Sequence, residues 1–416
     1  MNNNNIPTAP EYIKNFEQLG FGMFVHFGLY SALERGEWTY SIHGRDREEY
    51  MALAKSFDVG GMKDIVSLAK TAGCKYINIT TRHHDGFSLY DTKGLSDFDV
   101  MHSKTGRDLI KEYVDEARSA GLVPFFYHTT LDWTCPLFEE NFEEYLKYLH
   151  KSVELLCTNY GEIGGLWFDG NWSKPEADWR EGDLYKMIRS HQKNAIIIDN
   201  TGLSARGKMG HEEIDAVTYE RGLPCRPDLT GRSKYVTGEM CETICDHWGY
   251  ADDLNFKSVK TLIEELCECR KVGANFLLNV GPYADGSVSN MQKGIMESIG
   301  SWMGYYGKAI YNGRPYLTYT DRREFILKDA FDENVAYLFK FGVGQSSGDE
   351  NVSLDTCNHE GRGLFTGIDR KVKSIRYMDN GENVGFTQSE RGLDVEFAGF
   401  AYGQNLCVRV CEIEFE

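Results

Sequence analysis

Eight apolar segments of strand length alternate with amphipathic helix patterns between residues 21 and 306, and this alternation constrains the fold more than any other feature. The expected strands cover residues 21–28, 76–81, 122–127, 166–169, 195–199, 216–219, 235–237 and 276–280. The expected helices cover residues 62–73, 108–121, 142–157, 184–191, 259–272 and 291–306. Strand–helix repetition of this length predicts an α/β fold, a (β/α)8-like parallel barrel covered by helices.

The pattern changes after about residue 315, where short β segments follow one another without helices between them. These segments cover residues 316–320, 335–341, 374–378 and 406–410. The dipeptide Asn380-Gly381 is a good hairpin turn signal. We therefore expect two domains, a catalytic barrel at residues 1–314 and an all-β sandwich at residues 315–416.

Charge and hydropathy restrict the partners of this chain. Its formal net charge is −18, which argues against binding to nucleic acid or to anionic membranes. No apolar run approaches the length that a membrane span needs. The first five residues lack the basic and apolar regions of a signal peptide, so we expect a cytoplasmic protein, although a signal peptide removed earlier is left open.

The cysteines favour free thiols over a disulfide framework. There are 11 of them, an odd number, and many lie inside helix or strand patterns. Two close pairs, Cys241 with Cys245 and Cys267 with Cys269, have no second pair at zinc-site spacing. We expect neither a metal nor another cofactor.

Polar residues recur where the predicted strands end. They are His26, His83, His84, Tyr127, His128, Asp169, Glu220 and Asn279. Each of them alone is more often structural, but several at the same end of successive strands fit one polar pocket at the barrel mouth. Asp169 ends a short buried strand, and Gly170 then lets the chain turn away; the alternative reading of Asp169 is an N-cap of the next helix.

The residue types at these positions suggest a sugar as the ligand. The predicted pocket contains histidines, the rings of Trp38 and Trp167 and several acids, which suit an uncharged, hydroxyl-rich molecule. It has no glycine-rich loop that would bind a phosphate group. Hydrolysis of a glycosidic bond needs two carboxyl groups. Asp169 supplies one, and Glu220 and Glu239 compete for the second.

Several motifs in order make the chain resemble the α-L-fucosidases of glycoside hydrolase family 29. Residues 21–28 resemble the family's FG-x-F-x-HWG, residues 37–38 its EW, residues 81–87 its T-K-HHDGF, residues 166–170 its LWFDG, residues 238–250 its WETC-x-TI…WGY, and residues 279–286 its NVGP-x-x-DG. These motifs run through the whole expected barrel.

The resemblance implies a retaining hydrolase that releases terminal L-fucose from fucosylated oligosaccharides or glycoconjugates through a covalent fucosyl-enzyme. Asp169 falls at the family's nucleophile. The positions that hold the fucose correspond to His26, Glu37, Trp38, His83, His84, Tyr127 and Trp167. Glu220, in a segment that resembles the family's T-P-E, is preferred over Glu239 as the acid/base. The alternative readings are a buried acid that braces the site for Glu239 and an exposed loop acid for Glu220.

The chain departs from the family pattern at a few positions. Gly238 replaces a tryptophan, and His128 stands where a tyrosine or serine is frequent. After the segment 196–198 many relatives carry an arginine, whereas this chain has Asp199-Asn200-Thr201, and Arg206 could take over that role. These differences leave the linkage preference open. The sequence leaves the oligomeric state open as well.

Three other functions remain at this stage. The chain could be another retaining exo-glycosidase on a similar barrel, such as an α-galactosidase. It could be a metal-dependent hydrolase that uses His83, His84 and Asp169. It could also be a catalytically inactive sugar-binding protein, which the three candidate acids argue against.

Overall fold

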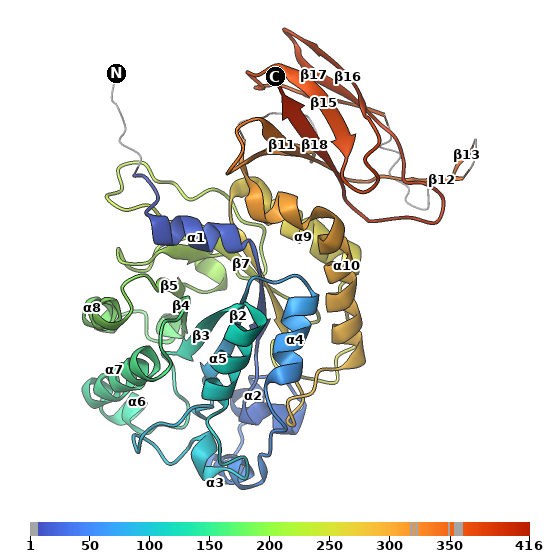
Figure 1. The fold of residues 1–416 in the computed structure, drawn as a ribbon. Helices are drawn as coiled ribbons and strands as arrows, with labels where there is room; N and C mark the ends of the chain where they lie inside the picture. The colour runs from blue at the N-terminus through green and yellow to red at the C-terminus, as the bar shows by residue number, and fades with distance from the viewer. Residues whose placement is uncertain (1–6, 317, 319, 321–322, 348–349, 353–360) are drawn as a thin grey trace. The chain divides into compact units, whose positions relative to one another are not determined.

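The structure, a computed structural model, describes residues 7–316, 318, 320, 323–347, 350–352 and 361–416. It contains two compact units, which are coloured by residue number in Figure 1. One consists of Met1–Lys257 with Ala274–Glu297, and the other of Ser258–Gly273 with Ser298–Glu416. The division into domains at residue 315 stays a prediction.

The first unit contains a closed barrel of eight parallel strands. They are β1 (Phe21–Val25), β2 (Tyr76–Arg82), β3 (Val123–Thr129), β4 (Gly165–Asp169), β5 (Ile196–Asn200), β6 (Ala216–Thr218), β7 (Thr237–Thr243) and β8 (Asn275–Val280). Each strand pairs with the next one, and β8 pairs with β1 to close the barrel. The predicted (β/α)8-like fold is therefore confirmed.

Helices connect the strands. They are α1 (Glu11–Leu19), α2 (Thr39–Ile42), α3 (Arg47–Ala52), α4 (Lys63–Thr71), α5 (Leu109–Ala120), α6 (Leu137–Glu140), α7 (Phe142–Asn159), α8 (Glu181–His191), α9 (Val259–Val272) and α10 (Asn290–Asn312). Short 3₁₀ helices include η4 (Asn171–Ser173), directly after β4. Local sequence sets the ends of α5, because Asp108 accepts a hydrogen bond from the Lys111 N–H at its start and Gly121 adopts a left-handed conformation at its end.

Apolar side chains fill the barrel interior at the end opposite the strand carboxyl termini. Ile13 and Phe16 of α1 belong to this core, and the Phe16 ring centroid lies 5.8 Å from that of Tyr76 and 5.7 Å from that of Phe125. Side chains alternate along a strand, so Phe125 and Tyr127 face inward. The polar strand ends above this core are therefore free to form a site.

Two barrel strands differ clearly from their predictions: β1 ends at residue 25 instead of 28, and β7 is displaced. The strand expected at residues 235–237 is β7, Thr237–Thr243, which starts where the prediction ends. The prediction ended the strand before Glu239, yet Glu239 and Glu242 are both buried inside β7 with hydrogen-bonding partners. Glu239 therefore lies within β7 rather than beyond a strand end.

The second unit contains α9, part of α10 and antiparallel sheets. Its strands are β9 (Gly313–Pro315), β10 (Phe325–Asp329), β11 (Val335–Lys340), β12 (Gln345–Ser347), β13 (Glu350–Val352), β14 (Gly361–Phe365), β15 (Val372–Tyr377), β16 (Gly385–Ser389), β17 (Gly392–Phe397) and β18 (Arg409–Phe415). They form a five-stranded sheet in the order β15-β18-β11-β10-β9, a three-stranded sheet β14-β17-β16 and the pair β12-β13.

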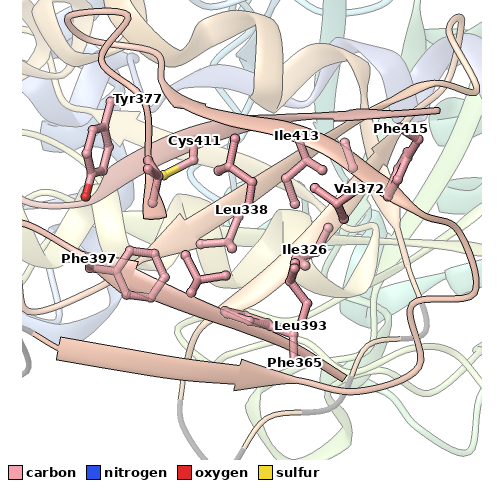
Figure 2. Packing of buried hydrophobic residues seen from close by; sticks show 14 residues of the cluster. Ile326, Leu338, Phe365, Val372, Tyr377, Leu393, Phe397, Cys411, Ile413 and Phe415 are labelled. Carbon is pink, nitrogen blue, oxygen red and sulfur yellow. The ribbon is translucent and has the colours of Figure 1, made fainter. Parts of the chain in front are cut away.

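The two larger sheets of this unit share one apolar core. Figure 2 shows Leu338 and Ile413 of the five-stranded sheet facing Phe365 and Leu393 of the three-stranded sheet. Side chains of both sheets thus form one layer between them, as in a sandwich. The predicted C-terminal all-β fold is confirmed.

Several details of the β region were predicted with errors. The expected turn at Asn380-Gly381 is present, since the Gly381 N–H donates to the Tyr377 carbonyl at 2.9 Å. The strand expected at residues 406–410 is β18, which begins at residue 409. The strand expected at residues 316–320 falls partly outside the described residues, and those that are described there are not in a strand.

Candidate active site

A cavity of about 650 Å³ opens at the carboxyl ends of the barrel strands. It is lined by Phe24, His26, Glu37, Trp38, His83, His84, Tyr127, Trp167, Asp169, Trp172, Asn200, Thr201, Gly202, Leu203, Ser204, Glu220, Arg221 and Trp248. Of the residues predicted for the pocket or the site, His128, Glu239 and Asn279 do not line this cavity, and all the others do.

Asp169 reaches the cavity because β4 ends at it. Trp167 and Asp169 point to the same side of the strand, toward the barrel axis. Gly170 has φ +120°, and a Cβ there would lie 2.6 Å from the backbone nitrogen of Leu131. Only glycine fits this close approach, so the chain can turn into η4 and leave the carboxylate exposed to the cavity.

Four side chains surround the Asp169 carboxylate. Trp172 Nε1 donates to Oδ1 at 2.8 Å and Asn200 Nδ2 donates to the same oxygen at 3.2 Å. Tyr127 Oη donates to Oδ2 at 3.0 Å, and His84 Nε2 lies 3.4 Å from Oδ2. Burial acts to raise the pKa of Asp169, but the interactions with His84, Trp172 and Tyr127 outweigh it and hold this pKa below its usual value. Asp169 is therefore an ionised carboxylate in the cavity.

Glu220 lies beside Asp169 and has the opposite electrostatic environment. Burial and the negative charge of Asp169 raise its pKa, and a hydrogen bond from Asn200 together with Arg221 and Arg206 only partly opposes them. Two neighbouring carboxyl groups whose pKa values move apart are suited to different roles, one ionised and the other protonated.

The separation of the two acids is limited by Asn200. Its Nδ2 lies 3.2 Å from Asp169 Oδ1 and 2.9 Å from Glu220 Oε2. One amide group therefore bridges the two acids, which keeps the two carboxyl groups close together in the cavity.

Glu239 lies in the barrel interior, beneath the cavity floor. Its Oε1 accepts a hydrogen bond from Trp167 Nε1 at 3.0 Å, and its Oε2 accepts one from Tyr76 Oη at 2.5 Å. Burial raises the pKa of Glu239 to about 7, against these two bonds. This carboxyl holds Trp167, whose ring faces the cavity, and does not itself line the cavity.

His26 and His83 present neutral rings to the cavity. Asn279 Nδ2 donates to the Trp248 carbonyl at 2.7 Å, so Asn279 Oδ1 accepts from His26 Nδ1 at 2.7 Å. Burial lowers the pKa of His26 to about 3, which leaves its Nε2 as an acceptor. Burial and the neighbouring His84 likewise lower the pKa of His83. Neutral imidazoles suit hydroxyl groups.

His84 is oriented from behind by a threonine. Thr129 Oγ1 donates to the Leu131 carbonyl at 2.5 Å, so it accepts from His84 Nδ1 at 2.7 Å. This bond points His84 Nε2 toward Asp169. His84 lies just after β2, and Asp169 is the last residue of β4.

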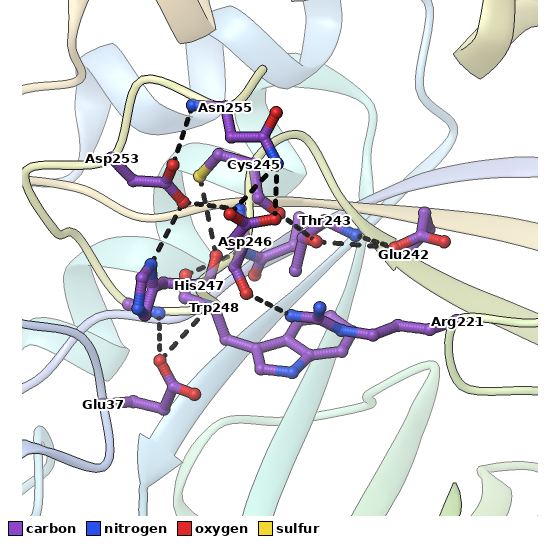
Figure 3. Close-up of polar contacts among 12 residues, drawn as sticks. Glu37, Arg221, Glu242, Thr243, Cys245, Asp246, His247, Trp248, Asp253 and Asn255 are labelled. Carbon is purple, nitrogen blue, oxygen red and sulfur yellow. Dashed lines mark hydrogen bonds and ion pairs between the residues drawn. The ribbon is translucent and has the colours of Figure 1, made fainter. Parts of the chain in front are cut away.

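The loop after β7 contributes Trp248 to the cavity lining, and Figure 3 shows the polar contacts of this loop. Glu37 Oε2 accepts hydrogen bonds from the backbone N–H groups of Trp248, at 3.1 Å, and Gly249, at 2.8 Å. The Arg221 guanidinium lies over the Trp248 ring, 5.3 Å from its centroid, and donates to the Asp246 carbonyl at 2.6 Å. These contacts fix both Glu37 and the Trp248 ring.

Indole rings line the outer part of the cavity. The rings of Trp38 and Trp172 are stacked, 6.0 Å apart at 19°. Trp133 meets the Trp38 ring edge-on at 4.9 Å. Trp172 remains 37% exposed, which leaves an apolar face for a ligand at the cavity mouth.

Other cavity residues were not predicted. They are Phe24, Trp172, Asn200, Thr201, Gly202, Leu203, Ser204, Arg221 and Trp248. Asn200 follows the strand expected at residues 195–199 by one residue, so the strand-end rule would have found it with a slightly longer strand. Most of the others lie on loops, whose conformations leave no periodic pattern in the sequence.

Two residues singled out as departures lie elsewhere. His128 faces away from the barrel interior, opposite to Tyr127, and its Nδ1 lies 2.9 Å from Thr81 Oγ1. Arg206 contacts the backbone carbonyl of Glu220 through Nε rather than lining the cavity. Arg206 therefore holds the Glu220 backbone, and its positive charge favours the carboxylate form of Glu220.

Within the described residues, no group of three or more His, Cys, Asp or Glu side chains is arranged to hold a metal ion. Each helix in the described ranges is too short or too polar to cross a bilayer.

Comparison with known proteins identifies the family. The sequence profile described as alpha-L-fucosidase matches residues 3–308. The chain belongs to the alpha-L-fucosidase family. It is therefore a glycoside hydrolase, and this membership confirms the resemblance drawn from the motifs.

Individual fucosidases match along most of their length. The tissue alpha-L-fucosidase of Rattus norvegicus is 24% identical over 353 residues, 77% of this chain and 74% of that protein. The tissue alpha-L-fucosidase of Homo sapiens is 25% identical over 332 residues, 72% of this chain and 69% of that protein.

Solved fucosidase structures share the fold. Alpha-L-fucosidase isoenzyme 1 from Paenibacillus thiaminolyticus superposes with a TM-score of 0.82 at 29% identity, over 98% of this chain and 99% of that chain. An alpha-L-fucosidase from Bacteroides thetaiotaomicron, a trapped covalent intermediate in complex with 2-fluoro-fucosyl fluoride, superposes with a TM-score of 0.82 at 22% identity, over 99% and 98%.

Proposed function

We propose that this fucosidase is a retaining enzyme in which Asp169 is the nucleophile and Glu220 the acid/base. The observation that carries the proposal is a pair of carboxyl groups in one cavity whose pKa values are moved in opposite directions. Retention also agrees with the covalent intermediate of the Bacteroides thetaiotaomicron fucosidase. The substrate is a terminal α-L-fucosyl residue of an oligosaccharide or glycoconjugate.

In the first half of the reaction, an Asp169 carboxylate oxygen attacks the anomeric carbon of fucose. The bond from this carbon to the leaving oxygen breaks, and Glu220 gives its proton to that oxygen. The products are the free leaving group, a β-linked fucosyl ester on Asp169 and an ionised Glu220. The raised pKa of Glu220 keeps the proton available for this step.

In the second half, water attacks the same anomeric carbon. Glu220 takes a proton from this water while the ester bond to Asp169 breaks. Free α-L-fucose leaves, Asp169 is again a carboxylate, and Glu220 is again protonated. Two inversions at one carbon give overall retention.

The remaining cavity residues bind the sugar. We infer that His26, His83, His84 and Glu37 hold its hydroxyl groups and that the rings of Tyr127, Trp38 and Trp167 contact its apolar parts. Neutral imidazoles exchange hydrogen bonds with hydroxyls without the cost of burying a charge, which supports this assignment.

Replacement of the nucleophile tests the proposal. Asp169→Asn removes the group that forms the ester but keeps the shape of the side chain, so kcat on an aryl α-L-fucoside should fall by roughly three orders of magnitude or more. Steady-state kinetics and circular dichroism together measure the loss and the fold.

A matched control lies on the same loop. Asp178→Asn changes an exposed aspartate after β4 and should leave kcat unchanged. Near-normal activity of Asp169→Asn would overturn the nucleophile assignment. An aryl α-galactoside assayed in parallel separates the fucosidase from the α-galactosidase alternative, because fucose lacks the 6-hydroxyl group.

A further inference from the structure

We propose that Asn200 is a positioning residue that couples the two carboxyl groups, with its amide nitrogen holding Asp169 and Glu220 in register through both halves of the reaction. This inference rests on the proposed roles of the two acids. It assigns a role to Asn200, which lies in the short run of residues that stands where many relatives carry an arginine.

The orientation of the Asn200 amide follows from its neighbours. The Gly202 backbone N–H can only donate, and it lies 3.2 Å from one amide atom, which must therefore be the oxygen Oδ1. Thr218 Oγ1 donates to the same oxygen at 3.1 Å. The NH₂ group consequently faces the acids. Asn200 is only 3% exposed, so water competes little for these bonds.

The strand register places Asn200 between the acids. Asp169 on β4 pairs with Asn200 on β5, so the two side chains leave neighbouring strands at the same height. β6 is the next strand, and Glu220 follows its last residue, Thr218, by two positions. An amide carries two N–H bonds, and one can be directed to each carboxyl group: 3.2 Å to Asp169 Oδ1 and 2.9 Å to Glu220 Oε2.

The bond to Glu220 opposes the other influences on that acid. Burial and Asp169 favour its protonated form, whereas Asn200, Arg221 and Arg206 favour its carboxylate form. The buried side chains of Cys241 and Tyr127 are also close enough to interact electrostatically with the Glu220 carboxyl group. Without the Asn200 donor, Glu220 would hold its proton more firmly.

The two halves of the reaction need opposite states of Glu220, and Asn200 is suited to both. In the free enzyme the Asp169 charge favours a protonated Glu220, as the acid step requires. In the fucosyl-enzyme that charge is consumed, and the remaining donor stabilises the carboxylate that acts as base. Asn200 also keeps Glu220 from turning away from the anomeric carbon.

The test is the pH profile of Asn200→Ala. Loss of a hydrogen bond to a charged group should lower kcat by roughly 10- to 100-fold. The alkaline limb of kcat/KM, which reports deprotonation of the general acid, should move to higher pH, because the variant lacks one group that favours the Glu220 carboxylate. Thr218→Val, which removes one of the two donors that orient the amide, should shift the same limb in the same direction by less.

Asn194→Ala is the matched control, since it removes an exposed amide just before the other end of β5 and should leave both kcat and the profile unchanged. A fall in kcat with an unmoved alkaline limb would overturn the coupling role. If Asn200→Ala does not fold, an unmoved limb in Thr218→Val overturns it instead. If Asp169→Asn is inactive while Asn200→Ala matches the wild type, only this inference fails.

Discussion

Two acids in one cavity differ in charge because their nearest partners differ. Both Asp169 and Glu220 are removed from water, which by itself raises a carboxyl pKa. Asp169 receives enough hydrogen bonds to reverse this effect, whereas Glu220 faces the negative charge of Asp169. The division of roles therefore arises from side chains on the neighbouring strands and loops.

The acid/base assignment predicts a difference between Glu220→Ala and Glu239→Ala. An aryl leaving group departs with little protonation, so loss of the acid should harm cleavage of a natural oligosaccharide at least 10²-fold more than formation of the fucosyl-enzyme from an aryl fucoside. Azide needs no general base, so it should accelerate Glu220→Ala. Because azide attacks the fucosyl-enzyme, the product should be the α-fucosyl azide, which product NMR identifies.

Glu239→Ala serves as the comparison. It removes the acceptor of Trp167 and Tyr76 inside the barrel, so both substrates should lose activity alike and azide should have no effect. Azide rescue of Glu239→Ala together with an unresponsive Glu220→Ala would require the two roles to be exchanged.

Much of the site was predictable at the residue scale, and the exceptions have physical causes. Strand ends meet at one face of a barrel, so His26, His84 and Asp169 could be brought together without coordinates. Trp172 could not, because its position depends on the turn that Gly170 allows. The sequence left Glu239 open between an acid/base and a buried acid, because its partners Tyr76 and Trp167 come from distant strands.

At the scale of elements, hydrogen bonds within the loop after β7 hold Trp248 in place. Asp253 Oδ2 accepts hydrogen bonds from the Asp246 N–H at 2.5 Å and from His247 Nδ1 at 3.0 Å, and its Oδ1 accepts one from the Asn255 N–H at 2.9 Å (Figure 3). The Asp253 side chain thus connects three other residues of the loop and stabilises its conformation. The WGY resemblance marked this loop, but the contacts that shape it involve residues outside that motif.

We therefore expect Asp253→Ala to act on binding more than on chemistry. A looser loop should weaken the hold on Glu37 and Trp248, which line the cavity and would contact a bound sugar in the ground state and the transition state alike. KM should rise roughly tenfold with kcat changed by less than about threefold. Steady-state kinetics measure both constants, and the melting temperature checks the fold.

The neighbouring Asp252 supplies the control for this change, because it is exposed and Asp252→Ala should have normal kinetics. A variant of Asp253 that loses kcat but keeps KM would show that the loop serves the chemical step instead.

Element boundaries were less predictable than element types. The strand β7 was misplaced because its acids are satisfied by partners in the barrel and the loop, which a local pattern does not show. By contrast, α5 was predicted almost to the residue, since both its cap Asp108 and its terminal Gly121 are local signals.

At the scale of the whole molecule, the alternation of strands and helices and its loss near residue 315 predicted both folds correctly. The barrel closes through β1 and β8, which are far apart in the sequence, and eight alternating units are what makes this closure expected. How the two sheets of the second unit pair was not predictable, because antiparallel strands offer many orders of similar local pattern.

The thiols provide a test of the proposed cytoplasmic location. The chain has 11 cysteines, and the ten that the structure describes are all free, while Cys357 lies outside the described residues. When the protein is unfolded without a reductant, a thiol reagent should therefore react at about 11 sites.

In the native state the thiols should differ in reactivity. Cys225 is exposed and should react first, because burial raises the pKa of Cys157 to about 12 and that of Cys245 to about 11. A lower thiol count that rises after reduction would reveal a disulfide and argue for an oxidising compartment instead.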